Sequence, residues 1–487
     1  MKKRISAAFL LLALLLNFSA CGTQNEDTET SANTPEQTTA ETEVVEKELY
    51  EKIDLDNSTV RVRYFGNADY EKYDVLGEDG GEVLADAVYK RNLTVEENFN
   101  MKFEWIKGSG DWLGYPAEME ALILSGNDAF DIGFMELSKC LPQSAMGYYK
   151  DMMNSKAIDI NDPWWYSDLI RNTQVNDLHM YYITGAFSLT TMLKAGSVFF
   201  NKDIWKANFG DTEKLYDMVR NETWTLDVMK QYSANVYKDV NGDGKLDGGD
   251  IYGYCNDGSN TIKYWSTCSG LSYSSRNEKG EPVLNMYNED ILKMVDLLYD
   301  MTWGANICYI NDGTITGVSA FKNQNALFYN KFLLHTMTQL RDTEFEWGVL
   351  PYPALYEKSG YANGASTVSG QCAFIPNTSA AIEMDSLLAV LNGLSAEAHV
   401  NVVPVCETAL RFKNSSDPSD AEMINIIYNS LDAQFIHAAN IALNELGSIF
   451  ELCVFGHKYN SGGYTSFWKA NEAAYQALLD TLIQNAK

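Results

Sequence analysis

Two periodicities alternate along residues 60–134. Apolar and polar positions alternate over 60–65, 101–105 and 130–134, which predicts three short strands. Between them, 81–100 and 115–127 place apolar residues at helical spacing, and the second helix is expected to end at Gly126. Strand, helix, strand, helix, strand is the order of an α/β protein with a largely parallel sheet.

Further short β-type runs follow, each ended by Gly, Asn or Pro. They lie at 181–187, 197–205, 326–330, 346–353 and 370–377. A helix is predicted to begin after Thr225, whose hydroxyl suits an N-cap, and to run to about Lys238. The roughly 430 residues of the body exceed a single core, which predicts two lobes.

The chain begins with a secretory signal, predicted over residues 1–20. Three basic residues at 2–4 precede a twelve-residue apolar run from Ile5 to Leu16. That run is too short to span a bilayer, which takes about 20 helical residues. The sequence FSAC at 18–21 resembles a bacterial lipobox, with Phe in place of the usual Leu. We therefore expect Cys21 to be the lipidated N-terminus. The alternative is an ordinary cleaved signal with an incidental cysteine.

Residues 21–57 are rich in Thr, Glu, Asn and Ser, and apolar residues are sparse before Val44. Such a segment buries too little surface to offset the entropy of ordering it. We expect it to be a disordered acidic tether between the lipid and the folded body. The protein is then held at the extracellular face of the cell membrane.

The chain has 487 residues and a net charge of −29. Removal of the signal leaves 34 basic against 66 acidic residues, a net charge of −32. This charge argues against nucleic acid as a partner and is compatible with uncharged or cationic ligands. Seven cysteines remain after Cys21, without a CxxC pair, so most are expected to be buried thiols. A pairing of Cys255 with Cys268 stays open.

The segment DVNGDGKLDGGD at 239–250 has the spacing of a calcium loop of EF-hand type. Gly244 at position 6 permits the sharp turn, whereas position 12 carries Asp in place of the usual bidentate Glu. A strand is predicted after the loop, so the second helix of a calcium sensor is missing and a structural calcium ion is expected. Its ligands would be Asp239, Asn241, Asp243, Lys245 through its carbonyl, Asp247 and Asp250.

The order of these features resembles the extracellular solute-binding lipoproteins of ABC importers, in the carbohydrate-binding branch related to maltose-binding protein. The residues that carry the likeness are the lipobox, the tether, FFNKDIW, NETWTLDVMKQYSANVYKDVNGDGKLDGGDIYG and GVLPYP. The resemblance implies a type II periplasmic-binding-protein-like α/β fold, with a ligand cleft between lobes joined by crossing strands. It implies lobe one at 58–190 plus 362–410, and lobe two at 191–361 plus 411–487. It also implies a monomer that delivers a sugar or oligosaccharide to permease subunits.

Ligand is expected beyond the carboxyl ends of the strands, as in other open α/β sheets. Aromatic rings there would stack on the faces of a sugar, and polar groups would bind its hydroxyls. The alternative for each aromatic residue is core packing, and for Glu136 a solvated helix start. Trp112 and Trp265 are preferred, because each lies in a polar segment rich in Gly or Ser that is predicted to be a loop. The candidates are Asn67, Trp112, Glu136, Trp165, Tyr264 and Trp265.

Three other functions are alternatives to sugar binding. A secreted glycoside hydrolase needs only two facing carboxylates, which 66 acidic residues can supply. No GxSxG, HExxH, Walker A or GxGxxG motif occurs, so binding without catalysis is favoured. A binding protein for peptides is the second alternative. An adhesin with dockerin-like loops is the third, although dockerins carry two such loops and this chain has one.

Overall fold

The computed structural model describes residues 49–304, 307–310, 315–364, 369–412 and 417–486. Cys21 and the predicted signal lie outside these residues, and the lobe boundaries stay a prediction. Residues 49–57, predicted as tether, are packed on the folded body. Tyr50 is buried, with its ring stacked on Phe99 at 5.9 Å and its hydroxyl donating to Glu397. The aromatic and apolar residues in this stretch bury enough surface to order it.

A four-stranded sheet has the order β11-β3-β1-β2. Its first three strands in sequence are parallel to one another, and β11 runs antiparallel to β3. The bounds are β1 Ser58–Tyr64, β2 Met101–Lys107, β3 Ile132–Glu136 and β11 Gln371–Phe374. The predicted parallel α/β start is therefore confirmed. The helices joined to these strands are α1 Ala68–Tyr70, α2 Val83–Asn98, α3 Gly114–Leu124 and α4 Leu137–Ala145.

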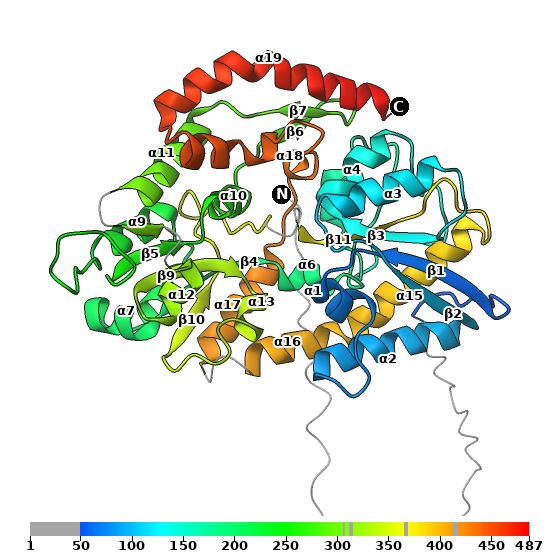
Figure 1. The fold of residues 1–487 in the computed structure, drawn as a ribbon, viewed down its shortest axis with the longest axis horizontal. Coiled ribbons are helices and arrows are strands. Elements are labelled where there is room, and N and C mark those ends of the chain that lie inside the picture. The colour runs from blue at the N-terminus through cyan, green and yellow to red at the C-terminus, as the bar shows by residue number, and fades with distance from the viewer. Residues whose placement is uncertain (1–48, 305–306, 311–314, 365–368, 413–416, 487) are drawn as a thin grey trace, which may run out of the picture. The chain divides into compact units, whose positions relative to one another are not determined.

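A five-stranded sheet has the order β10-β4-β9-β5-β8, and Figure 1 labels its strands β10, β4, β9 and β5. Strand β4 alone is antiparallel to its neighbours. The strands are β4 Gly196–Asn201, β5 Tyr252–Asn256, β8 Cys308–Ile310, β9 Ala326–Phe332 and β10 Trp347–Leu350. A hairpin of β6 Ser274–Arg276 and β7 Pro282–Leu284 stands apart. The chain thus crosses from the first sheet to the second at β4 and returns at β11, and each crossing strand opposes the direction of its new sheet.

Most of the remaining helices surround the second sheet or join the two sheets. Helix α16 packs on α2 and on α13, and α19 packs on α11 and α4, so each touches elements associated with both sheets. The bounds are α5 Ser167–Thr173, α6 Leu189–Leu193, α7 Lys202–Phe209, α8 Glu213–Arg220, α9 Leu226–Ala234, α10 Ser259–Thr267, α11 Glu289–Trp303, α12 Gly317–Lys322, α13 Leu334–Met337, α15 Met384–Asn401, α16 Val403–Phe412, α17 Pro418–Asn429, α18 Phe435–Ala438 and α19 Ser461–Asn485.

Two predicted strands differ from the structure. Residues 181–187 form only isolated bridges, such as that from Ile183 to Ala373. The run at 197–205 is strand only to Asn201, because the Asn201 side chain accepts a bond from the Ile204 amide and caps α7. Thr225 caps α9 as predicted, but α9 ends at Ala234 instead of reaching Lys238.

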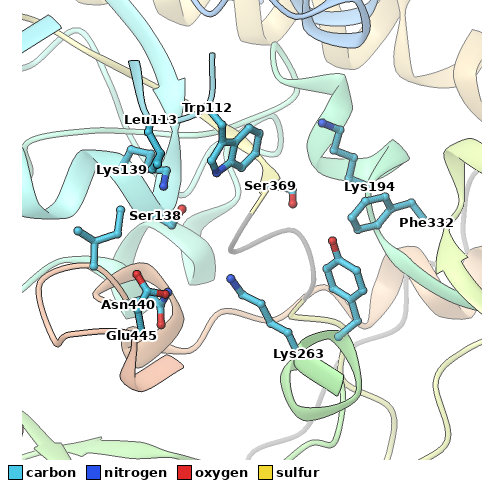
Figure 2. Close-up of a pocket in the computed structure, with 12 residues that line it drawn as sticks. Trp112, Leu113, Ser138, Lys139, Lys194, Lys263, Phe332, Ser369, Asn440 and Glu445 are labelled. Carbon is cyan, nitrogen blue, oxygen red and sulfur yellow. The ribbon is translucent and has the colours of Figure 1, made fainter. Parts of the chain in front are cut away.

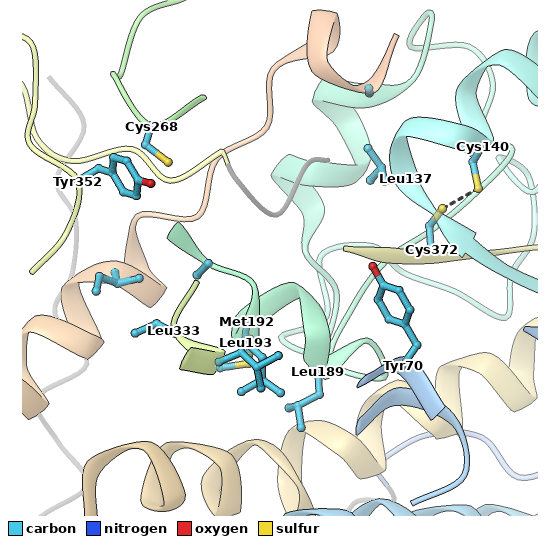
Figure 3. Packing of buried hydrophobic residues seen from close by; sticks show 14 of the residues in the cluster. Tyr70, Leu137, Cys140, Leu189, Met192, Leu193, Cys268, Leu333, Tyr352 and Cys372 are labelled. Atoms are coloured by element: carbon cyan, nitrogen blue, oxygen red, sulfur yellow. Dashed lines mark hydrogen bonds between the residues drawn. The ribbon is translucent and has the colours of Figure 1, made fainter. Parts of the chain in front are cut away.

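The buried core is continuous through the crossing region. Figure 3 shows Leu189 and Leu193 of α6 in this packing, near Tyr70. All seven cysteines of the described chain are free thiols, so Cys255 and Cys268 are not paired. The Cys372 thiol lies 2.9 Å from that of Cys140. One helical stretch, Met384–Leu410, is apolar enough by composition to cross a membrane, but 61% of its apolar window is buried inside the protein.

Candidate functional site

A cavity of about 540 Å³ opens at the carboxyl ends of strands from both sheets (Figure 2). The loop after β2, the start of α4 after β3, α10 after β5 and the end of β9 all contribute to its wall. This is the position in which open α/β sheets bind ligands. The lining residues are Trp112, Leu113, Ser138, Lys139, Lys194, Lys263, Tyr264, Phe332, Ser369, Asn440, Ile441 and Glu445.

Trp112 provides an aromatic surface on one side of the cavity. Its side chain is 40% exposed, and its ring meets Phe65 edge-on at 5.6 Å. The Asp111 carboxylate accepts bonds from the amides of Leu113 and Gly114, which holds this loop at the start of α3. An exposed indole on a loop braced in this way is available to a ligand without first ordering the chain.

Tyr264 and Phe332 provide aromatic surface on the side of the second sheet. Their rings meet edge-on, with centroids 4.9 Å apart. Tyr264 lies on α10 and Phe332 is the last residue of β9. The cavity therefore has aromatic rings on both sides and polar groups between them, which is the composition of a small-molecule site.

Three lysines converge on the same cavity. The side chains of Lys139 and Lys194 are buried, at 9% and 7% exposed, and Lys263 is intermediate. The Lys194 amino group lies 3.8 Å from the centre of the Tyr70 ring, and that of Lys139 lies 5.7 Å from the centre of the Trp112 ring. Burial lowers the pKa of all three amino groups.

Glu136 lies behind this wall at the end of β3 and is only 3% exposed. The Tyr70 hydroxyl lies within bonding distance of both the Glu136 carboxyl group and the Ser369 carbonyl. One hydroxyl proton cannot serve two acceptors, so a neutral carboxyl group that donates satisfies both contacts. Burial accordingly raises the pKa of Glu136 to about 8.

The six predicted ligand residues divide between the cavity and its surroundings. Trp112 and Tyr264 line the cavity, and Glu136 stands behind it. Asn67 does not line it and instead caps α1, accepting a bond from the Asp69 amide at 3.0 Å. An Asn at this position is explained by the cap alone.

Trp165 and Trp265 belong to the core, contrary to their predicted role. Trp165 is 4% exposed and donates to Asn392, and Trp265 is 2% exposed and donates to the Tyr254 hydroxyl at 2.8 Å. The polar residues around Trp265 indicated a loop, but they form α10. Adjacent helical residues point about 100° apart, so Tyr264 faces the cavity while Trp265 packs inward.

Sequence reasoning missed the lysines and the C-terminal contribution to the wall. Lys194 is a single charge between two apolar runs, in LTTMLKAGSVFF, and that isolated charge was an available signal. Lys263 directly precedes a residue that was predicted. Asn440 and Glu445 follow α18, distant in sequence from the strands, and no pattern in the sequence points to them.

The predicted calcium loop connects α9 to β5, as expected. The Asp239 carboxylate accepts bonds from the amides of Gly242 and Gly244, at 2.7 and 2.9 Å. Both glycines have positive φ, near 73° and 71°, which side chains rarely adopt. The tight turn that position 6 requires is thus formed.

Asp250 closes the loop from a fully buried position. Its carboxylate accepts bonds from the Val240 amide and the Tyr237 hydroxyl, both at 3.2 Å. Within the described residues, no three His, Cys, Asp or Glu side chains gather closely enough to hold a metal by themselves. An ion here would need the Asn241 amide oxygen, the Lys245 carbonyl and water as well, an all-oxygen set of the kind that calcium takes.

Comparison with known proteins identifies the fold. No protein-family model and no curated protein matches the chain. An ABC substrate-binding protein of Listeria monocytogenes, Lmo0181, solved with cycloalternan, is 12% identical, with a TM-score of 0.54 over 88% of this chain and 99% of that one. The sugar-binding protein MalE of Xanthomonas citri is 14% identical, with a TM-score of 0.55 over 88% and 98%.

A third similar structure is UgpB of Mycobacterium tuberculosis in complex with glycerophosphocholine. It is 12% identical, with a TM-score of 0.53 over 82% of this chain and 95% of that one. The chain therefore has the two-lobed α/β fold of type II periplasmic binding proteins, as the sequence predicted.

The buried carboxyl group of Glu136 makes the stability of the folded protein depend on pH. The pKa of Glu136 is about 8 in the folded state and 4.5 when unperturbed. At pH values between 4.5 and 8 the carboxyl group is therefore protonated in the folded protein and ionised in the unfolded protein. The free energy of unfolding contributed by this group falls as pH rises from about 4.5 to about 8. Glu136→Gln removes this dependence, so the variant should gain stability relative to the parent between pH 5 and pH 8.5 in urea denaturation.

Glu344→Gln, at an exposed carboxylate, is the matched control and should show no such gain. Asp74, whose pKa burial raises to about 7, titrates in parent and variants alike and cancels in the comparison. If the difference in the free energy of unfolding between Glu136→Gln and the parent is the same at pH 5 and at pH 8.5, the raised pKa of Glu136 is contradicted.

Proposed function

We propose that this protein is an extracellular solute-binding protein that captures a carbohydrate and delivers it to an ABC permease. The observation that carries the proposal is the cavity with aromatic rings from both sheets and polar side chains between them. Trp112 and Tyr264 offer ring faces to the CH-rich faces of a sugar, and Ser138 and Asn440 offer partners for its hydroxyls. The similar structures described as sugar-binding or bound to cycloalternan support this choice.

Binding proceeds without chemical conversion of the sugar. Among the described residues that line the cavity, Glu445 is the single carboxylate, and it accepts a bond from the Asn440 amide at 2.5 Å. Glu136 is enclosed behind the wall by Tyr70. A glycoside hydrolase needs two carboxyl groups that flank the scissile bond, and the described part of this wall offers one.

Capture follows from the position of the cavity. Its two aromatic sides belong to elements of different sheets, joined by the chain crossings before β4 and at β11. A ligand that touches both sides makes more contacts when they approach, so it favours the closed arrangement.

Removal of the Trp112 ring should weaken carbohydrate binding without unfolding the protein. Trp112→Ala deletes an exposed face, and we expect a loss of about 2 kcal/mol, roughly thirtyfold in Kd. Calorimetry against mono- and oligosaccharides measures this. Tyr287→Ala removes a similarly exposed ring, at 39%, that does not line the cavity, and should leave Kd unchanged. If peptides give heat of binding and no saccharide does, the assignment of a carbohydrate ligand is wrong. If the protein converts a sugar chemically, the claim that it only binds its ligand is wrong.

Lipidation at Cys21 holds the protein at the extracellular face of the membrane. The support is the sequence: a basic start, a twelve-residue apolar run and a cysteine directly behind it, followed by a polar segment. Anchoring keeps the binding protein close to its permease without inserting the body into the bilayer.

Cys21→Ser should release the protein into the culture medium, because no acyl chain can then be attached. Fractionation of cells and medium with detection of the protein measures the change. Cys453→Ser, at a buried thiol of the body, should remain with the membrane. Membrane attachment of Cys21→Ser as firm as that of the parent would place the anchor elsewhere.

A structural calcium ion at 239–250 stabilises the junction of α9 with β5. The support is the all-oxygen side-chain set, the turn at Gly244 and the enclosed Asp250 carboxylate. Asp239, Asn241, Asp243 and Asp247 would supply side-chain or water-mediated oxygens, Lys245 its carbonyl, and Asp250 the last ligand.

Chelation should therefore lower the melting temperature. An ion bound only by the folded state adds about 2.7 kcal/mol at 100 times its Kd. EDTA should remove this increment from the parent, and Asp243→Ala should melt at the same temperature with and without EDTA. Asp217→Ala, an exposed aspartate on α8, should keep the parent's sensitivity. A parent melting curve that EDTA leaves unchanged, on protein loaded with calcium, counts against the site.

A further inference from the structure

We infer that the captured solute is an acidic saccharide, whose carboxylate or sulfate group is bound by Lys139, Lys194 and Lys263 while its rings lie against the aromatic surfaces. The inference rests on the proposed function and names the chemical class of its ligand. It differs from the expectation drawn from net charge, which was compatible with uncharged or cationic ligands.

The three lysines reach the cavity from three separate parts of the chain. Lys139 lies in the first turn of α4, Lys194 is the C-cap residue of α6 just before the crossing to β4, and Lys263 lies on α10 (Figure 2). Lysine is rarely buried unless it is paired, yet Lys139 and Lys194 are at most 9% exposed. Their convergence is therefore a property of the site and not of a solvated surface.

The described part of the chain does not neutralise these amino groups directly. None of the three makes an ion pair or hydrogen bond with a carboxylate in the described residues, whereas surface lysines such as Lys102 do so. The acidic groups that act on them from a distance are Glu136, Glu445, Glu451, Asp69 and Asp74. Burial outweighs their attraction, because it remains the largest influence on each lysine and lowers each pKa.

The balance of charge on the wall is positive. Among the described residues that line the cavity there are three lysines and one carboxylate, Glu445, and burial raises the pKa of Glu136 behind them to about 8. The chain as a whole carries a charge of −29. A positive site in a strongly negative protein concentrates an anion at the cavity that the rest of the surface repels.

The ring surfaces narrow the class of anion. An inorganic ion needs the lysines but makes no use of Trp112, Tyr264 or Phe332. A neutral sugar needs the rings, but its hydroxyls can be bound by serine and asparagine without the cost of burying charge. A saccharide with an acidic group uses both parts of the wall.

Calorimetry on the full folded body with matched ligand pairs tests the inference. Trigalacturonate is compared with its methyl ester, which keeps the rings and removes the charge, and 3′-sulfolactose is compared with lactose. We expect an acidic member to bind at least tenfold more tightly than its neutral partner, and its Kd to rise with sodium chloride. The carboxylate and sulfate pairs show which acidic group is preferred.

Variants connect the preference to the lysines. Lys263→Gln should weaken the acidic ligand by about ten- to a hundredfold, as expected for a charge-assisted bond, and the neutral ligand much less. Lys139→Gln is a second variant of the same kind, and melting curves verify that both are folded. Lys102 has a side chain that is 73% exposed and pairs with Glu96 outside the cavity. Lys102→Gln also removes one positive charge, and it should leave the Kd of both the acidic and the neutral ligand unchanged.

The outcomes separate this inference from the proposed function. Neutral saccharides that bind as tightly as acidic ones, with Lys263→Gln and Lys139→Gln unchanged, would overturn the acidic ligand and leave carbohydrate capture standing. Binding of peptides with no heat from any saccharide, acidic or neutral, would overturn both.

Discussion

Tyr70 joins the segments on which the site depends. Its hydroxyl contacts Glu136 at the end of β3 and the Ser369 carbonyl just before β11, and its ring lies beneath the Lys194 amino group just before β4. Both chain crossings and the end of a central strand are therefore held by one buried side chain. Removing it would leave a buried carboxyl group and a buried lysine without their contacts, which is costly in a low-dielectric interior. The position of Lys194 at the cavity follows from this arrangement.

The same arrangement explains how a negatively charged protein forms a positive cavity. Burial raises the pKa of Glu136 to about 8, so this carboxyl group is mostly protonated at pH 7 and cancels little of the charge of the lysines. Lys139 and Lys194 are held by aromatic rings, which attract a cation through their electron-rich faces and remove no positive charge. In the protein without ligand, these desolvated positive charges raise the free energy of the folded state. An anionic ligand would lower that free energy when it binds beside them.

Periodicity predicted the parts of the structure that local patterns decide. The α/β order through residue 134, the end of α3 just before the positive-φ Gly126 and the cap at Thr225 needed only spacing and side-chain chemistry. Trp112 was found because it lies in a polar loop after a strand. Trp265 was wrongly predicted to contact ligand, because the polar residues around it belong to a helix. In a helix, the side on which a residue lies decides whether it is buried, and the composition of the segment does not. The lysines were missed since their burial depends on segments far apart in the sequence, and the tether was predicted too long because Tyr50 finds its partner in Phe99.

A crystal structure of the protein with an acidic saccharide bound would test the central claim most directly. The account predicts the sugar rings against Trp112 and Tyr264, and the acidic group within hydrogen-bonding distance of at least one of Lys139, Lys194 and Lys263. A saccharide bound outside this cavity, or bound inside it with its acidic group directed away from all three amino groups, would contradict it.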